Sequence, residues 1–310
     1  MKRVLMGLLV LSGLLWGAAS AGAQGTCAAG AVERGVIEGV LTSGGIERHY
    51  LLYVPESYDP AQPTPLVLSL HGFASNPGQQ MEFSVWNDLA DEHGFLVAYP
   101  QGTGFPLRWN TDQLPDAEYR FNGRADDVTF ISDLIDRAAE DYCLDQARVY
   151  ATGLSNGGGM SNRLACELAD RITAIGTVAG AYPPLVEGCN PSRPVPVMAF
   201  HGTEDTIVPY EGAAFQGTAF PAIPDWAAGW AERDGCDLTP EAMDSVGEVD
   251  IIRYVNCEGG AQVILHTVNG GGHNWPGGGE QPSLIMGNVN CDVNASERMW
   301  AFFEGYSRDD

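Results

Sequence analysis

The sequence has little positive charge. Its 310 residues include 16 lysines and arginines against 40 aspartates and glutamates, which gives a formal net charge of −24 at pH 7. A surface of this kind repels phosphate backbones and anionic lipids. Nucleic acid is therefore not an expected partner, and a neutral substrate such as a polysaccharide or a polyester suits the chain better. The simplest explanation of the acid excess itself is solubility or salt tolerance.

Long apolar runs are also missing, except at the start of the chain. Two positive charges precede an uncharged run over 4–16, and small residues then end at Ala23. This is the pattern of a secretory signal peptide. The run is shorter than the roughly 20 apolar residues that cross a bilayer, which counts against a retained anchor. We therefore expect removal of residues 1–23, secretion to the extracellular space or the periplasm, and no membrane contact afterwards.

No two cysteines have CxxC spacing, so zinc is poorly supported and we expect no metal. The seven cysteines all follow the predicted leader. In an exported protein, disulfides are the default state of such residues. We predict the pairs Cys166 with Cys189 and Cys236 with Cys257, because each closes a loop of about two dozen residues. Because seven is an odd number, at least one thiol is free or pairs between chains.

Nothing in the composition divides the chain into parts. We find no internal repeat, no low-complexity linker and no appended second module. The residues after the leader are enough for one large α/β domain with a well-buried core. We therefore predict a single domain over 24–310, and we expect a monomer.

Short apolar runs alternate with helical patterns along most of the chain. Near the N-terminus, alternation of apolar and polar residues around Ser43-Gly44-Gly45 predicts a β-hairpin. Continuous apolar runs follow, with helical stretches between several of them. This order indicates a mostly parallel central sheet flanked by helices on both faces. The runs are PLVLSLHG, FLVAYPQG, RVYATGLSNG, ITAIGTVAG, VPVMAFHG and QVILHTVNGGGH.

Three helices have clear signals. One apolar stripe follows a pair of aspartates, which suit a helix N-terminus. A second stripe starts directly after Ser155. A third helix is predicted over 295–305, where Asn294 and Glu297 have capping-box spacing. The first stripe is Val128, Ile131, Ile135 and Ala138, and the second is Met160, Leu164 and Leu168.

The stretch ATGLSNGGGM contains the pattern G-x-S-x-G at the end of a predicted strand and the start of a predicted helix. In a sharp strand-to-helix turn the serine backbone is strained, so the residues two positions away must be small. Gly153 and Gly157 satisfy this requirement. The pattern predicts that Ser155 is a nucleophile held clear of the sheet.

A serine hydroxyl needs a base, and the base needs an orienting acid. Asp205 follows one later predicted strand, and His273 follows another. The order Ser, Asp, His is the one expected on an α/β-hydrolase sheet. Glu204 is a rival for the acid, but Asp205 heads the turn toward Val208. Only His273 lies after the acid on a glycine-rich loop. We favour structural roles for His49, His93 and His266. His71 and His201 precede glycines at strand ends, ahead of loops rather than opposite the serine.

A tetrahedral intermediate needs two backbone donors for its negatively charged oxygen. The amide of Asn156, which follows the nucleophile at the helix start, is one candidate. The other should come from the loop after an earlier strand, and the sequence LHGFAS places the amide of Phe73 there. We predict an oxyanion hole made by Phe73 and Asn156.

Taken together, these motifs resemble those of secreted α/β-hydrolase esterases of the polyhydroxybutyrate depolymerase and feruloyl esterase type, which overlap with carbohydrate esterase family one. The resemblance extends from HYLLYVPESYD to ASERMWAFF, with PLVLSLHGFASN, RWN, ADDVTFISDLI, RVYATGLSNGGGMSNRLAC, RPVPVMAFHGTEDTIVPY and GGGHNWPGG between them in family order. It implies a Ser155, Asp205, His273 triad that hydrolyses carboxylic esters without a cofactor.

The sequence departs from that family in two places. Many relatives carry a cysteine in the segment after the WN block, and TDQLPDAEYRFNGR has none. Depolymerases that attack solid polyester usually add a granule-binding module, and we expect none here. The second departure favours soluble or partly soluble esters, such as feruloyl or acetyl esters of plant polysaccharide or short hydroxyalkanoate oligomers.

Four aromatic residues lie on loops near the predicted site: Phe73, Trp109, Tyr210 and Trp275. An aromatic wall suits a phenolic acid or a polyester chain, and packing under a loop is the alternative for each of them. We predict substrate contacts for Trp109, Tyr210 and, above all, Trp275.

Two other functions remain compatible with these residues. A serine peptidase of the same fold uses the same triad, although we see no propeller or cap domain of the kind that some such peptidases carry. A non-catalytic carbohydrate-binding protein is the other alternative, but it would have no reason to keep all three triad residues.

Overall fold

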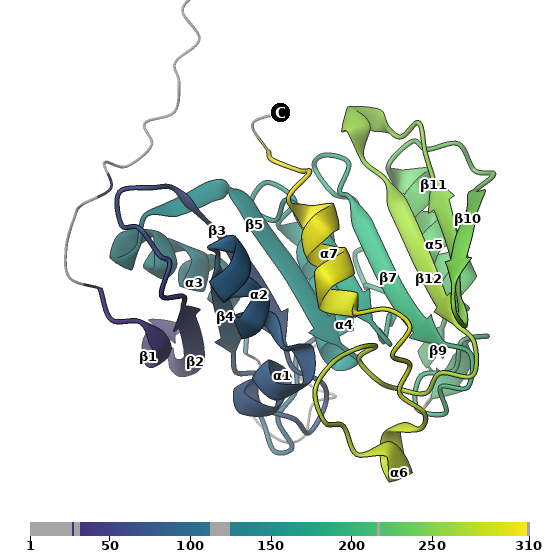
Figure 1. Ribbon diagram of the computed structural model, residues 1–310, viewed down its shortest axis with the longest axis horizontal. Helices are drawn as coiled ribbons and strands as arrows, with labels where there is room; N and C mark the ends of the chain where they lie inside the picture. The colour runs from purple at the N-terminus through teal and green to yellow at the C-terminus, as the bar shows by residue number, and fades with distance from the viewer. Residues whose placement is uncertain (1–26, 28–31, 112–124, 216–217, 309–310) are drawn as a thin grey trace, which may run out of the picture.

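The computed structural model describes residue 27 and residues 32–111, 125–215 and 218–308 (Figure 1). The predicted leader over 1–23 lies outside the described residues, as does the segment 112–124 that follows the WN block. Among the helices that are described, none combines the length and the apolar character needed to cross a bilayer.

A ten-stranded sheet forms the centre of the fold, in the order β1-β2-β4-β3-β5-β6-β7-β12-β11-β10 (Figure 1). The six strands from β4 to β12 in this order are parallel, and two strands at each end pair antiparallel. These six are the apolar runs of the sequence, so the predicted mostly parallel sheet is confirmed. The bounds are β1 (Gly35–Ser43), β2 (Ile46–Val54), β3 (Thr64–Leu70), β4 (Leu96–Pro100), β5 (Leu144–Leu154), β6 (Ala174–Val178), β7 (Val197–Gly202), β10 (Glu241–Val246), β11 (Val249–Tyr254) and β12 (Val263–Val268).

Helices cover both faces of this sheet. In Figure 1, α1, α2 and α7 lie in front of the sheet, and α3, α4 and α5 lie behind it. The two faces hold separate apolar cores, and alternate residues of one strand enter different cores: Leu66 and Leu68 of β3 pack with α3 and α4, whereas Val67 packs with α2 and α7. The bounds are α1 (Pro77–Ser84), α2 (Trp86–His93), α3 (Asp127–Asp141), α4 (Asn156–Glu167), α5 (Ile223–Arg233) and α7 (Ala295–Phe303).

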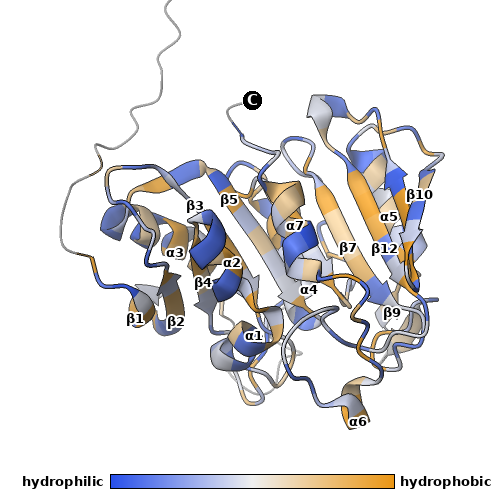
Figure 2. Cartoon of the chain, in the orientation of Figure 1, coloured by the Kyte–Doolittle hydropathy of each residue, from blue (hydrophilic) through white to orange (hydrophobic). Residues whose placement is uncertain are grey.

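Burial explains why the central strands read as continuous apolar runs. Every residue of β3, β4, β6 and β7 is buried, because helices exclude water from both of their faces. The edge strand β10 is exposed along five of its six residues. Figure 2 shows the same contrast, with apolar residues along β7 and β12 and polar residues on β10.

The predicted helix signals agree with the structure. All four residues of the first stripe are buried on α3, and the Asp126 side chain caps that helix by accepting a hydrogen bond from the Thr129 amide. Met160 and Leu164 are buried on α4. The Asn294 side chain accepts from the amides of Ser296 and Glu297 at the start of α7, so helix capping accounts for this segment.

Several elements had no clear signal in the sequence. The antiparallel strands β10 and β11 extend the sheet at one edge. The stretch between Asp205 and α5 forms a small separate hairpin of β8 (Ala213–Phe215) and β9 (Thr218–Phe220), and a short helix, α6 (Ser283–Met286), follows the His273 loop.

Three disulfides tie the fold together. The predicted pairs Cys166–Cys189 and Cys236–Cys257 are both present. A third disulfide joins Cys27 to Cys143. Cys291 is the remaining cysteine, and it is free and exposed. The Cys166–Cys189 bond matters for the site because it joins α4, the helix that begins after Ser155, to the loop after β6.

Candidate active site

Ser155 occupies a strained turn between β5 and α4. Its φ of 57° and ψ of −117° lie in a region that residues other than glycine rarely adopt. Backbone hydrogen bonds hold it there: its amide donates to the carbonyl of Val178 at 2.9 Å, and its carbonyl accepts from Gly159 at 2.9 Å and from Ala181 at 3.0 Å. The position of the serine is therefore fixed by β6, by the loop that follows β6 and by the first turn of α4.

The positions around Ser155 require glycine because there is no room there for a side chain. A Cβ on Gly153 would lie 2.5 Å from the carbonyl carbon of Gly157, and a Cβ on Gly157 would lie 2.1 Å from the carbonyl oxygen of Leu70. A Cβ on Gly158 or Gly159 would also meet backbone, at 2.9 Å and 2.1 Å. The steric requirement predicted for Gly153 and Gly157 is met, and it extends to the next two residues.

Asp205 and His273 meet at the ends of two adjacent parallel strands, β7 and β12. The Nδ1 of His273 lies 2.7 Å from the Oδ2 of Asp205, and both side chains are buried. Because an ionised carboxylate only accepts hydrogen bonds, the shared proton belongs to Nδ1. The Nε2 of His273 is then the basic nitrogen. Glu204, the rival acid, is exposed.

The carboxylate of Asp205 is held by donors on both oxygens. Its Oδ1 accepts from the amides of Ile207 at 2.9 Å and Val208 at 2.8 Å. Its Oδ2 faces a second imidazole, since the Nε2 of His201 lies 3.3 Å away. That Nε2 also lies 2.8 Å from the carbonyl oxygen of Val208, which only accepts, so Nε2 carries a proton.

These donors set the ionisation of Asp205. Burial by itself would raise the pKa of this carboxyl group, but hydrogen bonds from His201 and His273 more than offset that effect. The pKa of Asp205 therefore lies well below its ordinary value, and the group is a carboxylate at any pH near neutrality. A permanent negative charge here stabilises a protonated His273.

Ser155 stands at the same edge of the sheet as this pair. It follows β5 as Asp205 follows β7 and His273 follows β12, and these strands run parallel (Figure 1). The loops at this edge are bonded to one another: the amide of Glu204 donates to the carbonyl of Gly271 at 2.9 Å. The structure thus brings Asp205 and His273 into contact and places Ser155 on the rim that they share.

The two predicted oxyanion donors flank Ser155. Asn156 follows it as the first residue of α4, and the segment containing Phe73 approaches it closely, since a Cβ on Gly72 would lie 3.5 Å from the Cβ of Ser155. Neither the Phe73 amide nor the Asn156 amide donates to any group in the described part of the chain. Both are therefore available to an oxygen bound at the serine.

His71 stabilises the loop that carries Phe73. Its Nδ1 lies 2.7 Å from the carbonyl oxygen of Gly72, and its Nε2 accepts from the amide of Gly102 at 3.0 Å. Burial lowers the pKa of this imidazole to about 4, so it is neutral and able to serve as donor and acceptor at once. This histidine therefore positions a loop.

The predicted substrate contacts of Trp109 and Trp275 are wrong in this structure, because both indoles are fully buried. The Trp275 ring belongs to the core between the sheet and α7, and its N–H donates to the hydroxyl of Ser296 at 3.0 Å. The Trp109 N–H donates to the carbonyl of His71 at 2.9 Å. Trp109 does support the site, because its backbone amide and carbonyl bind the side chain of Asn156.

The other two aromatic residues remain accessible. Phe73 is more than half exposed beside the serine turn. Tyr210 is partly buried, and its hydroxyl lies 2.8 Å from that of Thr267. A substrate contact stays a prediction for Tyr210.

Reasoning from the sequence missed the contact between His201 and Asp205. The four-residue spacing in HGTED is the signal that could have revealed it, because a tight turn after β7 returns the acid to the histidine. Among the described residues, no group of three or more histidine, cysteine, aspartate or glutamate side chains could hold a metal ion.

Comparison with known proteins connects this geometry to a family. The family model described as esterase PHB depolymerase matches residues 48–226. The chain is 32% identical to feruloyl esterase B of Piromyces equi over 73% of its own length and 42% of that protein's, and 28% identical to feruloyl esterase C of Emericella nidulans over 83% of each. It therefore spans less than half of the first of these relatives.

Solved structures show the same fold. The acetyl xylan esterase from Aspergillus awamori superposes with a TM-score of 0.58 at 16% identity, covering 83% of this chain and 94% of that one. A thermostable esterase gives a TM-score of 0.55 at 20% identity, covering 88% and 63%. With its open, mostly parallel sheet, the chain has the predicted α/β-hydrolase fold.

Proposed function

Because the chain belongs to the esterase PHB depolymerase family, we propose that it hydrolyses carboxylic esters with Ser155 as nucleophile, His273 as base and Asp205 as orienting acid. The observation that supports this most directly is the 2.7 Å contact between His273 and Asp205 on the rim that carries a strained Ser155. Serine, histidine and aspartate in this relation activate a hydroxyl for attack on a carbonyl carbon.

The reaction has two steps. The Oγ of Ser155 attacks the ester carbonyl while the Nε2 of His273 takes its proton. The amides of Phe73 and Asn156 donate hydrogen bonds to the oxyanion, and collapse of the intermediate expels the alcohol, which receives the proton from His273. Water then attacks the acyl group with His273 again as base, and this releases the acid and restores Ser155.

We infer neutral esters as the substrates and export as the destination of the chain. A net charge of −24 disfavours polyanionic substrates, and three disulfides suit an oxidising compartment. The named relatives are feruloyl and acetyl xylan esterases, and the family model is named after polyhydroxybutyrate depolymerase. Feruloyl or acetyl esters of polysaccharide and hydroxyalkanoate oligomers are thus the classes to compare.

The test is a Ser155→Ala variant assayed beside the natural chain on methyl ferulate, acetylated xylan and hydroxybutyrate oligomers. We expect turnover of the accepted ester to fall by several orders of magnitude, with thermal unfolding nearly unchanged. Labelling by a fluorophosphonate probe should be lost in parallel. If the variant keeps substantial esterase activity, Ser155 is not the nucleophile.

A further inference from the structure

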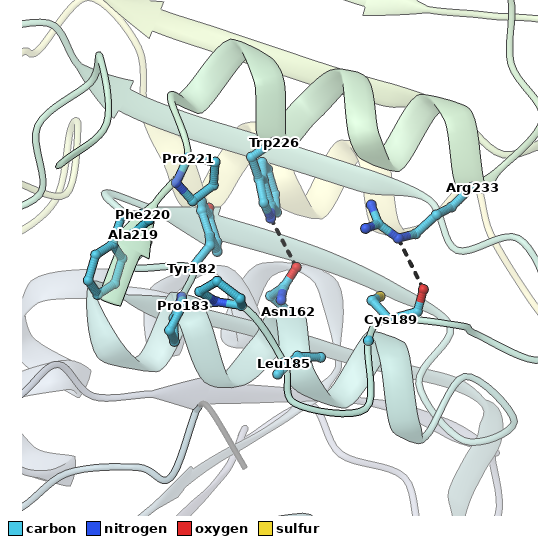
Figure 3. A pocket seen from close by; sticks show the side chains of 12 residues that line it. Asn162, Tyr182, Pro183, Leu185, Cys189, Ala219, Phe220, Pro221, Trp226 and Arg233 are labelled. Atoms are coloured by element: carbon cyan, nitrogen blue, oxygen red, sulfur yellow. Dashed lines mark hydrogen bonds between the residues drawn. The ribbon is translucent and has the colours of Figure 1, made fainter. Parts of the chain in front are cut away.

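A cavity of about 450 Å³ opens beside the candidate active site, between α4, α5 and the loop after β6 (Figure 3). Most of its wall is apolar: Tyr182, Pro183, Leu185, Phe220, Pro221 and Trp226. Tyr182 and Trp226 stack on each other with ring centroids 3.9 Å apart, so each ring covers one face of the other. No described residue that lines the cavity is acidic, although the chain as a whole is strongly acidic.

One polar group in this wall has a fixed direction. The side-chain oxygen of Asn162 accepts from the indole N–H groups of both Trp226 and Trp230, each at 3.0 Å. Since indoles only donate, the oxygen must face them, and the amide NH₂ must face away from them. That NH₂ has no acceptor among the described residues, and Asn162 lines the cavity while more than nine-tenths buried. The wall therefore presents an unused donor.

Arg233 provides a second hydrogen-bond donor at one end of the cavity. Figure 3 shows Ala219 and Phe220 at one end of the cavity and Arg233 with Cys189 at the other. The Nε of Arg233 donates to the carbonyl of Cys189 at 3.2 Å, which fixes the guanidinium at this end. Its two Nη groups have no hydrogen-bond acceptor in the described part of the chain, so they can donate to an anion, although the charge of Arg233 also interacts with those of Asp234 and Glu232.

The cavity is close to Ser155 along two paths. Asn162 lies seven residues after Ser155 on α4, a distance of about 10 Å along the helix. Tyr182 follows Ala181, whose amide donates to the carbonyl of Ser155 at 3.0 Å. A ligand in the cavity is therefore separate from the reacting carbonyl but within the length of a short oligomer.

From these observations we propose that the cavity binds a carboxylate that carries an apolar body, with the carboxylate at Arg233 and Asn162. A sugar fits less well, because sugar hydroxyls need acceptors as well as donors and the Tyr182–Trp226 stack leaves less open aromatic surface. The inference rests on the proposed esterase function in one respect: such carboxylates arise there either as the released acid or as the free acid end of an oligoester substrate.

Binding is tested first, in the Ser155→Ala background so that nothing is hydrolysed. Cinnamate and its neutral counterpart cinnamamide are titrated calorimetrically at pH 7. We expect cinnamate to bind about 10-fold more tightly, because its charge is paired with a guanidinium. Arg233→Met should remove that difference. Arg137→Met, which changes an exposed arginine on α3, is the matched control and should preserve it.

Asn162→Asp provides a second variant that does not depend on Arg233. It keeps an oxygen for the two indoles but replaces the NH₂ by an acceptor, so cinnamate binding should weaken by about 10-fold or more while cinnamamide changes little. Thermal unfolding of each variant checks that the fold is kept. Equal affinity for the acid and the amide in the parent, or unchanged cinnamate binding in Arg233→Met, overturns the proposal.

Kinetics then distinguish the two sources of the carboxylate. The natural chain is given the 4-nitrophenyl monoester of suberic acid and the same compound with its acid end methylated. If the site receives the acid end of the substrate, the free acid has the lower KM, and Arg233→Met removes that preference. If it receives only released acid, both esters have the same KM and cinnamate inhibits. Absence of any turnover would contradict the proposed esterase function, whereas the titrations would still decide on the cavity.

Discussion

Two buried aspartates of this molecule have opposite properties. Asp205 lies at the end of β7 and Asp234 follows α5, and both are almost fully removed from water. Asp205 has donors on both oxygens, and its pKa lies below the ordinary value. Asp234 has one donor, the Val195 amide at 3.0 Å, and its Oδ2 has no partner among the described residues.

The comparison shows that the number of donors, and not burial alone, decides which form of a carboxyl group is stable. Burial raises the pKa of Asp234 to about 7, and the hydrogen bond from Val195 with the charges of Arg193 and Arg233 does not offset it. Asp127 is intermediate in its number of hydrogen-bond donors. It has Arg48 at 2.7 Å and the Asn110 amide at 2.8 Å, yet burial keeps its pKa above the ordinary value.

The largest effect is expected when the charge of Asp205 is removed. In Asp205→Asn the amide cannot hold His273 in the same tautomer or stabilise its protonated form, so kcat should fall by about 10⁴-fold. Steady-state assays on the preferred ester measure this. Glu204→Gln, which neutralises the adjacent exposed acid, is the control and should keep most of the activity. Comparable losses in the two variants would contradict the assignment of Asp205.

Removal of the cation beside Asp127 should have the next largest effect. Arg48→Met leaves a buried carboxyl group with only the Asn110 amide, and we expect a loss of about 3–5 kcal/mol in the free energy of unfolding. Denaturant unfolding measures it. Arg137→Met breaks the exposed ion pair with Asp141 and should cost roughly 0.5 kcal/mol or less. If Arg48→Met lowered the free energy of unfolding by as little as Arg137→Met does, the buried pair of Arg48 and Asp127 would contribute little to stability.

Asp234 should make stability depend on pH in the opposite direction from Asp205. Its pKa is about 7 in the folded state, above that of the unfolded chain, so the folded state retains a proton that the unfolded state releases between about pH 4 and 7. The free energy of unfolding should therefore fall across that window, by a few kcal/mol at most. In Asp234→Asn, the free energy of unfolding should decrease less across the same pH range.

For Asp205, the free energy of unfolding changes with pH in the opposite direction. A lowered folded pKa stabilises the fold above about pH 4, and this contribution is lost as pH falls further. Melting temperatures of the parent and Asp234→Asn at pH 2, 3, 4, 5, 6 and 8 separate the two aspartates, because Asp205 acts below pH 4 and Asp234 above it. An identical pH profile in parent and variant would mean that Asp234 has an ordinary pKa.

The smallest effect concerns the second imidazole on Asp205. His201→Phe removes one donor, so the pKa of Asp205 should rise toward its ordinary value and kcat/KM should fall by about 10-fold. The acid limb of the stability curve should move to higher pH. His201→Gln, whose amide can still donate to Asp205, should restore both properties in part. If the stability changes but kcat/KM does not, His201 does not influence catalysis through Asp205.

Local signals predicted much of this fold. The central strands are buried on both faces, so their apolar runs are visible in the sequence, and the strained turn required glycines around Ser155. The order of Ser155, Asp205 and His273 indicated one rim. The capping residue Asn294 and the close cysteine pairs were predictable for the same reason, since each depends on neighbours in the chain.

Contacts between distant segments could not be predicted in this way. The burial of Trp275 depends on Ser296 of α7, and the packing of Trp109 depends on the loop of His71. Both tryptophans are on loops near the site, as expected, but their rings turn into the core. The edge strand β10 lacked a signal because it is almost entirely exposed and has no apolar period.

The packing around the four glycines on either side of Ser155 has a practical consequence for engineering. A library that randomises Gly153, Gly157, Gly158 and Gly159 should consist almost wholly of inactive clones, because any side chain there collides with backbone that cannot move. Residues 183–185 and 219–221 contain no glycine packed in this way, and they line the cavity described above. Directed evolution of ester selectivity is best confined to them.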